Sequence, residues 1–99
     1  MKSKENLEQI LKKYKQYLRL EKSLSSNTVQ AYLNDVNKLF QYLEGKNVHP
    51  YDVTLEHLEN FSASLHALGI QARSQARILS GIRSFYHHLV MDDYIQTDP

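Results

Sequence analysis

Apolar residues recur along this chain at the three- and four-residue spacing of helix faces, in four separate segments. We predict helices over residues 5–21, 26–44, 55–68 and 72–91, because each segment carries one apolar stripe and one polar face. No stretch alternates apolar and polar residues as a strand would. The pattern therefore predicts an all-α fold, a compact four-helix bundle with short loops.

The last segment, residues 72–91, divides most clearly into two faces. Its inner stripe centres on Ile78, Ile82 and Phe85. The opposite face carries arginine and short polar side chains: Arg73, Arg77, Ser80, Ser84 and His87. A helix of this length spans about 27 Å at about 1.5 Å per residue. We therefore place it at the centre of the fold and expect one core to hold Phe40, Phe61, Ile82 and Phe85.

The breaks between the segments carry helix start and stop signals. Ser25 or Ser26 can cap the second helix, and Thr54 is a good N-cap for the third. Gly45 stands where a left-handed residue would end the second helix. Gly69 ends the third, with Ile70 placed to make the apolar contact of a Schellman motif.

The two ends of the chain are expected to differ. Met1–Lys4 should fray, and Tyr94 and Ile95 should fold back onto the core after the fourth helix stops at Asp92 and Asp93. Gln96–Pro99 looks like the start of a linker. The 99 residues then form a single domain over 1–99.

Composition narrows the class of protein without naming it. The net charge is +1 overall, distributed as +4 over residues 1–22, −3 over 23–70 and 0 over 71–99. The chain has no cysteine, no apolar run long enough to span a membrane and no secretory signal at its N-terminus. These features favour a cytoplasmic location with no membrane partner.

Catalytic and metal chemistry find little support in the residues. The histidines lack the i, i+4 pairing of metal ligands on a helix, so we expect no metal and ordinary surface or interfacial histidines. No glycine-rich phosphate loop is present, and no cofactor is expected. Tyr14, Tyr17, Tyr32 and Tyr86 lie on or near apolar stripes, which favours core positions over a nucleophile.

The polar faces of the second and fourth helices are more informative. The second exposes an acid-free row: Asn27, Gln30, Ala31, Asn34, Lys38 and Gln41. Asparagine, glutamine, serine and arginine side chains hydrogen-bond phosphates and base edges, and Ala31, Ser80 and Gly81 would let the backbone approach a duplex. The residues alone leave three interpretations open: a solvated face, a DNA-binding face and a protein-binding face.

Three stretches resemble one protein family in the right order and spacing. SNTVQAYLNDVNKLF (26–40), followed by Tyr42 and Leu43, resembles the second-helix signature of the N-terminal core-binding domain of tyrosine recombinases, the phage-integrase family. VTLEHLENF (53–61) is similar to its third helix, and RILSGIRSFY (77–86) with Leu89 to its fourth. Asp98–Pro99 stands where such domains lead into the catalytic domain. The likeness is greatest to Xer-type and transposon-encoded integrases.

The resemblance implies a SAM-like orthogonal bundle that clamps duplex DNA through helices two and four during strand exchange, with no cofactor. The catalytic residues belong to another domain of the same chain, so this stretch is expected to lack enzyme activity, although the full-length protein would be a site-specific recombinase or integrase. Other recombinase subunits on DNA would be partners. The positions carried over are Asn27, Thr28, Asn34, Lys38, Arg73, Ser74 and Arg77.

Two further expectations complete this interpretation. Arg83 borders the apolar stripe, so we expect it to pair with an acid such as Asp35, whose role would be structural. The alternative function is a small helical protein-interaction or regulatory module, which an exposed apolar patch around Tyr14 and Tyr17 would favour.

Overall fold

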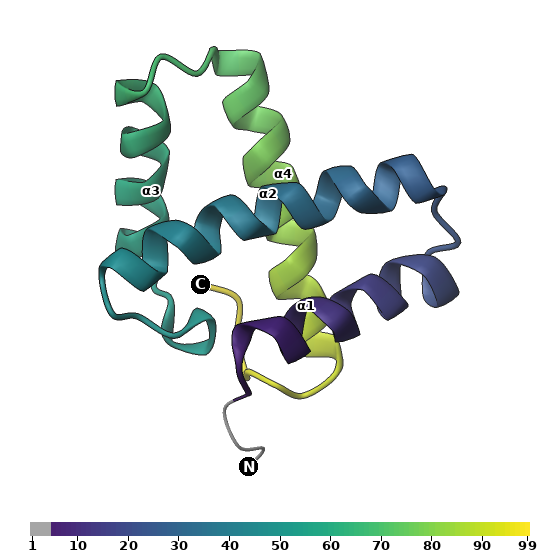
Figure 1. The fold of residues 1–99 in the computed structure, drawn as a ribbon. Coiled ribbons are helices and arrows are strands. Elements are labelled where there is room, and N and C mark those ends of the chain that lie inside the picture. Colours follow the sequence, from purple (N-terminus) through teal and green to yellow (C-terminus); the bar gives the residue numbers. More distant parts are fainter. Residues whose placement is uncertain (1–4) are drawn as a thin grey trace.

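A computed structural model describes residues 5–99 (Figure 1). Its four main helices are α1 (Leu7–Gln16), α2 (Ser26–Gly45), α3 (Leu55–Ala67) and α4 (Ala72–Met91). A π-helical turn, η1 (Tyr17–Glu21), follows α1, and a 3₁₀ turn, η2 (Pro50–Asp52), precedes α3. No strand occurs in this part of the chain, which confirms the all-α prediction. The prediction that Met1–Lys4 frays lies outside the described residues.

The helices do not form one parallel bundle: in the view of Figure 1, α1 follows the direction of α2, α3 follows that of α4, and the two pairs cross. In Figure 1, α2 crosses α4 near the middle of both, and these two helices share the most extensive contacts in the fold. α1 packs below α2, and α3 packs beside the N-terminal half of α4. The fold is therefore an orthogonal four-helix bundle with α4 at its centre, as predicted.

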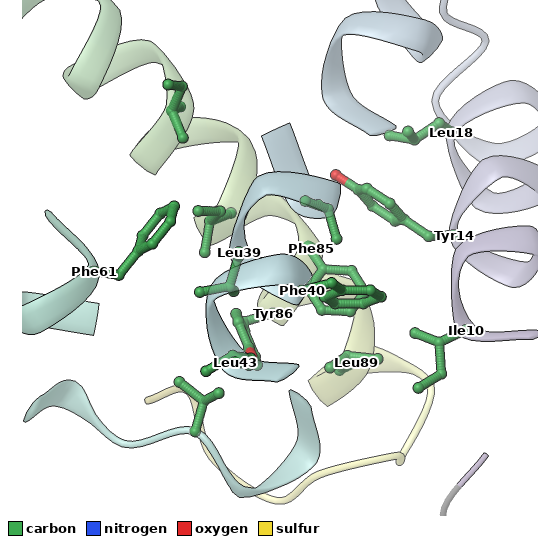
Figure 2. Close-up of a cluster of buried hydrophobic side chains, with 14 of the residues drawn as sticks. Ile10, Tyr14, Leu18, Leu39, Phe40, Leu43, Phe61, Phe85, Tyr86 and Leu89 are labelled. Carbon is green, nitrogen blue, oxygen red and sulfur yellow. The ribbon is translucent and has the colours of Figure 1, made fainter. Parts of the chain in front are cut away.

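The core forms where these helices meet. Figure 2 shows side chains of α1 on one side and Phe61 of α3 on the other, converging on α2 and α4. Phe85 is fully buried and packs edge-to-face on Tyr14 and Phe40, with ring centroids 5.1 and 5.6 Å apart. Phe61 and Ile82 belong to the same cluster, which confirms the predicted core.

The first helix departs from the prediction of one helix over 5–21. After Gln16 the backbone widens into the π-helical turn, in which the N–H of Lys22 donates to the carbonyl of Tyr17, five residues earlier. Tyr17 and Leu18, at the start of this turn, are both buried in the core. Leu20 faces outward and is 78% exposed.

Most predicted caps are confirmed, and one is wrong. Ser25 caps α2 and Thr54 caps α3, while Ile70 donates to the Leu65 carbonyl and Gly69 has a φ of 83°, as in a Schellman motif. Gly45 is the last helical residue of α2 instead of its left-handed terminator. Asn47, with a φ of 58°, takes that place, because asparagine tolerates the left-handed conformation.

The chain beyond α4 turns back onto the core. The N–H of Tyr94 donates to the carbonyl of Leu89, and Tyr94 and Ile95 are half-buried against the hydrophobic cluster. The predicted helix end before Asp92 is confirmed.

His88 differs from the predicted surface or interfacial histidines because it is buried. Its ring packs on Tyr14 and Tyr17, and its Nδ1 lies 3.1 Å from the Asp92 carboxylate. Burial lowers the pKa of His88, although the nearby Asp92 and Glu21 carboxylates oppose the shift. The folded protein therefore holds His88 neutral more strongly than the unfolded chain does.

We expect this burial to make stability depend on pH. Below the unfolded-state pKa of about 6.5, the unfolded chain binds a proton at His88 more readily than the folded protein does. The contribution of neutral His88 to the free energy of unfolding is therefore present above that pH and is lost as the pH falls. Even if folded His88 takes up no proton, the loss through His88 between pH 6.5 and 5.5 is limited to about 1 kcal/mol. Urea unfolding of the wild type and of His88→Gln measures it. The variant should lose this component and exposed His87→Gln should keep it; equal pH dependence in all three would contradict the assignment.

Candidate nucleic-acid interface

The polar row predicted on the second helix lies on the surface of α2. Asn27, Gln30, Asn34 and Lys38 are exposed and follow one another at helical spacing. The Gln30 amide Nε2 donates to Asn34 Oδ1 at 3.0 Å, which orients both amides. Thr28 is only half-buried, and its N–H donates to Ser25 Oγ, so this residue also serves the helix cap.

The corresponding face of α4 is exposed as well. Arg73, Ser74, Arg77 and Ser80 all lie on the surface. The N-cap residue of α4, Gln71, makes no side-chain hydrogen bond to the first turn, in contrast to Ser25 on α2. The start of α4 thus presents N–H groups without a side-chain acceptor, next to two of the predicted site residues.

Arg77 is the predicted site residue that joins the two helices. Its Nη1 lies 2.9 Å from Oδ2 of Asp35, and the pair forms a hydrogen-bonded ion pair between α4 and α2. The prediction that Arg83 pairs with Asp35 is therefore wrong. Arg83 lies six residues further along α4 and lines a groove between α3 and α4 with Leu58 and Glu59.

Gly81 explains how Asp35 reaches the helix crossing. A Cβ atom at this position would lie 2.8 Å from Asp35 Oδ2, so only glycine leaves room for the carboxylate. Gly81 is buried there, and the prediction that it lets the backbone approach a duplex is wrong. The glycine accommodates a side chain of the same protein.

We expect Gly81→Ala to destabilise the fold although alanine is the better helix former. Helix propensity favours alanine by about 1 kcal/mol, whereas overpacking of a buried contact costs about 1–3 kcal/mol. The expected net result is a loss of up to about 2 kcal/mol in urea unfolding. Gly45→Ala, where nothing lies within 4 Å of the added Cβ, is the matched control and should be stabilising. A Gly81→Ala gain equal to that of the control would show that Asp35 does not crowd this position.

Asp35 dominates the electrostatics of the crossing. Its side chain is 1% exposed, and its second oxygen, Oδ1, has no hydrogen-bond partner among residues 5–99. Burial raises the pKa of the Asp35 carboxyl, and the positive charges of Arg77 and then Lys38 oppose that shift. The buried carboxylate thus lies within the fields of two predicted site residues, one from each helix.

The structure therefore joins some of the predicted residues and not others. Gln30 contacts Asn34, and Lys38 and Arg77 share the field of Asp35. No described contact links Arg73, Ser74 or Ser80 to α2, so their place in a common surface rests on sharing a helix face with Arg77.

Other kinds of site find no support in residues 5–99. No three histidine, aspartate or glutamate side chains gather as a metal site would require, and no helix combines the length and apolar character needed to cross a bilayer.

The buried tyrosines have structural partners. The hydroxyl of buried Tyr14 donates to Ser84 Oγ, and that of Tyr86 donates to the Pro50 carbonyl. Burial raises the pKa of both tyrosines, so they act as neutral structural donors.

Sequence reasoning missed the role of Asp35 beside Arg77. The available signal was positional: Gly81 falls between Ile78 and Phe85 on the inner side of α4, where a missing side chain indicates a close contact. Asp35 likewise precedes Leu39 by one turn on the inner side of α2. A small residue and an acid on facing inner stripes together predict a buried polar contact.

Comparison with known proteins finds one family model and several related recombinases. Residues 11–92 match the family model described as "Phage integrase, N-terminal SAM-like domain". Tyrosine recombinase XerC of Pseudomonas syringae pv. tomato is 36% identical over 94 residues, which cover 94% of this chain and 31% of the relative. Tyrosine recombinase XerD of Staphylococcus saprophyticus is 34% identical over 94 residues, covering 94% and 32%. The chain thus spans about a third of the length of these relatives. No solved structure matches significantly.

Proposed function

The chain belongs to the phage integrase N-terminal SAM-like domain family. We propose that it is the N-terminal domain of an XerC-like tyrosine recombinase and that it binds duplex DNA through α2 and α4. The binding surface would comprise the exposed polar faces of the two helices. Its members are Asn27, Thr28, Gln30, Asn34, Lys38, Arg73, Ser74, Arg77 and Ser80. The faces would enter the major groove and hold the duplex during strand exchange.

The observation that supports this proposal is the near-absence of acidic groups on the two helices. Within α2 and α4 the only acids are Asp35 and Glu44. Asp35 is buried and paired with Arg77, and Glu44 lies at the last turn of α2, away from the crossing. The exposed faces therefore offer amides, hydroxyls and cations, which are the groups that contact phosphates and base edges.

The rest of the recombinase activity is proposed from the family. The relatives are named tyrosine recombinases, and this chain covers about a third of their length. We propose that strand cleavage and religation belong to a catalytic domain in the remaining two thirds of such a protein. This domain would then act with that catalytic domain and with other recombinase subunits on the same DNA.

The proposal predicts weak, salt-sensitive binding by the isolated domain. Lys38, Arg73 and Arg77 are the cations on the two faces, so two or three phosphate contacts are available. Each contact changes the slope of log K against log salt by about −0.9, so affinity should fall about 12- to 42-fold between 50 and 200 mM salt. Nonspecific dissociation constants of about 10⁻⁴ to 10⁻⁶ M are expected.

The test is a charge-removing variant that leaves the Asp35–Arg77 pair intact. Lys38→Ala combined with Arg73→Ala should weaken binding to short duplexes and flatten the salt slope by about 1.8. Lys12→Ala with Lys15→Ala removes two exposed charges from α1 instead and is the matched control. Equal binding by the two double variants, or no duplex binding by the wild type at 50 mM salt, would reject the proposal.

The second candidate function is a protein-interaction module, and the structure exposes less apolar surface for it than the sequence predicted. Tyr14 and Tyr17 are buried, so neither contributes an exposed patch. Within residues 5–99, Leu20 of the π-helical turn is the large apolar side chain of this segment that is exposed. Association that persists at high salt without DNA, and that Leu20→Ser abolishes, would favour this candidate over DNA binding.

A further inference from the structure

The ion pair between Asp35 and Arg77 is strongly asymmetric in its exposure. The Asp35 side chain is 1% exposed, whereas the Arg77 side chain is 56% exposed. One end of the pair is therefore anchored in the helix crossing, and the other end reaches the surface proposed to meet DNA. Surface ion pairs usually leave both ends in water and hold neither in place.

The anchored end has little freedom to move. Asp35 Oδ2 lies above Gly81, where even an added Cβ would approach to 2.8 Å, so the carboxylate fills the space that the glycine leaves. A carboxylate confined in this way fixes the position of the arginine Nη1 that binds it at 2.9 Å.

The exposed end keeps most of its hydrogen-bonding capacity. A guanidinium carries five N–H donors in one plane, and the described contact with Asp35 engages one nitrogen, Nη1. The remaining donors belong to a planar group that is tethered to α2 through Nη1, and the Arg77 side chain is 56% exposed. A planar donor set tethered at one nitrogen suits a bidentate acceptor, such as the O6 and N7 edge of guanine.

The pair also changes the charge that DNA would meet. The carboxylate offsets the guanidinium charge at a distance of 2.9 Å, so the pair attracts phosphates less than a free arginine does. Lys38 and Arg73 have no ion-pair partner among residues 5–99 and can serve the phosphates. A neutral but fixed donor set adds little to nonspecific affinity and favours sequence discrimination.

We propose that Asp35 is a positioning residue, which fixes and neutralises Arg77 so that Arg77 reads a base edge instead of holding a phosphate. The inference rests on the proposed function, because it assigns roles within the same DNA-binding surface. It predicts that sequence preference depends on Asp35, a residue that the duplex itself does not touch.

Asp35→Asn tests the charge with little change in size. It frees the arginine charge, so the salt slope on a fixed mixed-sequence duplex should steepen by about 0.9, a further 3.5-fold loss between 50 and 200 mM salt. The sequence preference, measured by sequencing the bound fraction of a random duplex pool, should fall toward that of Arg77→Ala. Arg77→Ala itself should lose about 5- to 150-fold of discrimination at one base position.

The double variant separates positioning from a general structural effect. If Asp35 acts through Arg77, Asp35→Asn should cause no further loss of preference in the Arg77→Ala background. Glu44→Gln, which removes an exposed acid from the same helix, is the control and should leave sequence preference unchanged. Asp35→Asn matching Glu44→Gln in both salt slope and preference would overturn the inference.

Arg77→Lys provides a test that keeps the ion pair and its charge. A lysine can still neutralise Asp35 but has no planar donor set, so sequence preference should fall while the salt slope stays within about 0.3 of the wild type. Full sequence preference in Arg77→Lys would overturn the inference. Failure of the proposed function looks different, because the Lys38→Ala, Arg73→Ala variant would then bind every duplex as tightly as the wild type.

Discussion

Phe85→Ala is expected to lower the free energy of unfolding by about 3–5 kcal/mol. The ring is fully buried, and three aromatic rings surround it edge-on: Tyr14, Phe40 and Tyr86, with centroids at 5.1, 5.6 and 5.1 Å. Truncation removes these contacts together and leaves a cavity where α1, α2 and α4 meet (Figure 2). Small domains are stable by about 5–15 kcal/mol, so the variant should be close to its folding limit.

Urea unfolding followed by circular dichroism measures this loss as a lower midpoint at an unchanged slope. Leu68→Ala is the matched control, because Leu68 is an apolar helix-end residue that is exposed. The control should stay within about 0.5 kcal/mol of the wild type. Similar midpoints for the two variants would mean that the inner face of α4 has been assigned incorrectly.

The helices and the core could be predicted because burial imposes a periodic pattern on the sequence. The 72–91 prediction coincides with α4, since Ile78, Ile82 and Phe85 repeat at helical spacing and acids follow at once. Thr54 and Gly69 mark their helix ends through local hydrogen bonding and left-handed geometry, which need only neighbouring residues. Such features depend on the local sequence and are therefore visible in it.

The departures share a different physical origin. The π-helical turn begins at Tyr17, where Tyr17 and Leu18 are buried in a core shared with other helices, and the helical spacing of residues 5–21 gives no sign of it. Gly45 and Asn47 both tolerate helix-ending geometry, and the sequence does not decide between them. Neither the position of the π-helical turn nor the residue that ends α2 follows from the spacing of apolar residues alone.

The candidate site shows the same division. The exposure of the polar side chains on α2 could be predicted because they lie opposite its apolar stripe. These residues are Asn27, Gln30, Asn34 and Lys38. Which arginine faces Asp35 depended on the crossing of α2 and α4, which no periodicity specifies, and the prediction chose Arg83 wrongly. That these faces bind DNA stays a prediction, supported by the family and by the absence of exposed acids near the crossing.

The crossing leads to the second large expected effect, which concerns stability and needs no DNA. Arg77→Ala should cost about 2–3 kcal/mol, because it leaves the Asp35 carboxylate buried without its partner. Breaking a fully buried ion pair costs about 3–5 kcal/mol, and the lower value expected here reflects the exposure of Arg77, where water can replace part of its contact. The same substitution at exposed Arg73, one turn earlier, has no buried charge to strand and is the control.

The origin of this cost can be tested by removing the stranded charge. Asp35→Asn in the Arg77→Ala background should recover part of the stability, since a neutral amide is cheaper to bury alone than a carboxylate. Urea unfolding of the wild type, the two single variants and the double variant completes the cycle, with a coupling of about 1 kcal/mol or more expected for residues in contact. Additive losses would show that Asp35 and Arg77 do not stabilise each other. Asp35 could then not position Arg77 for contact with DNA.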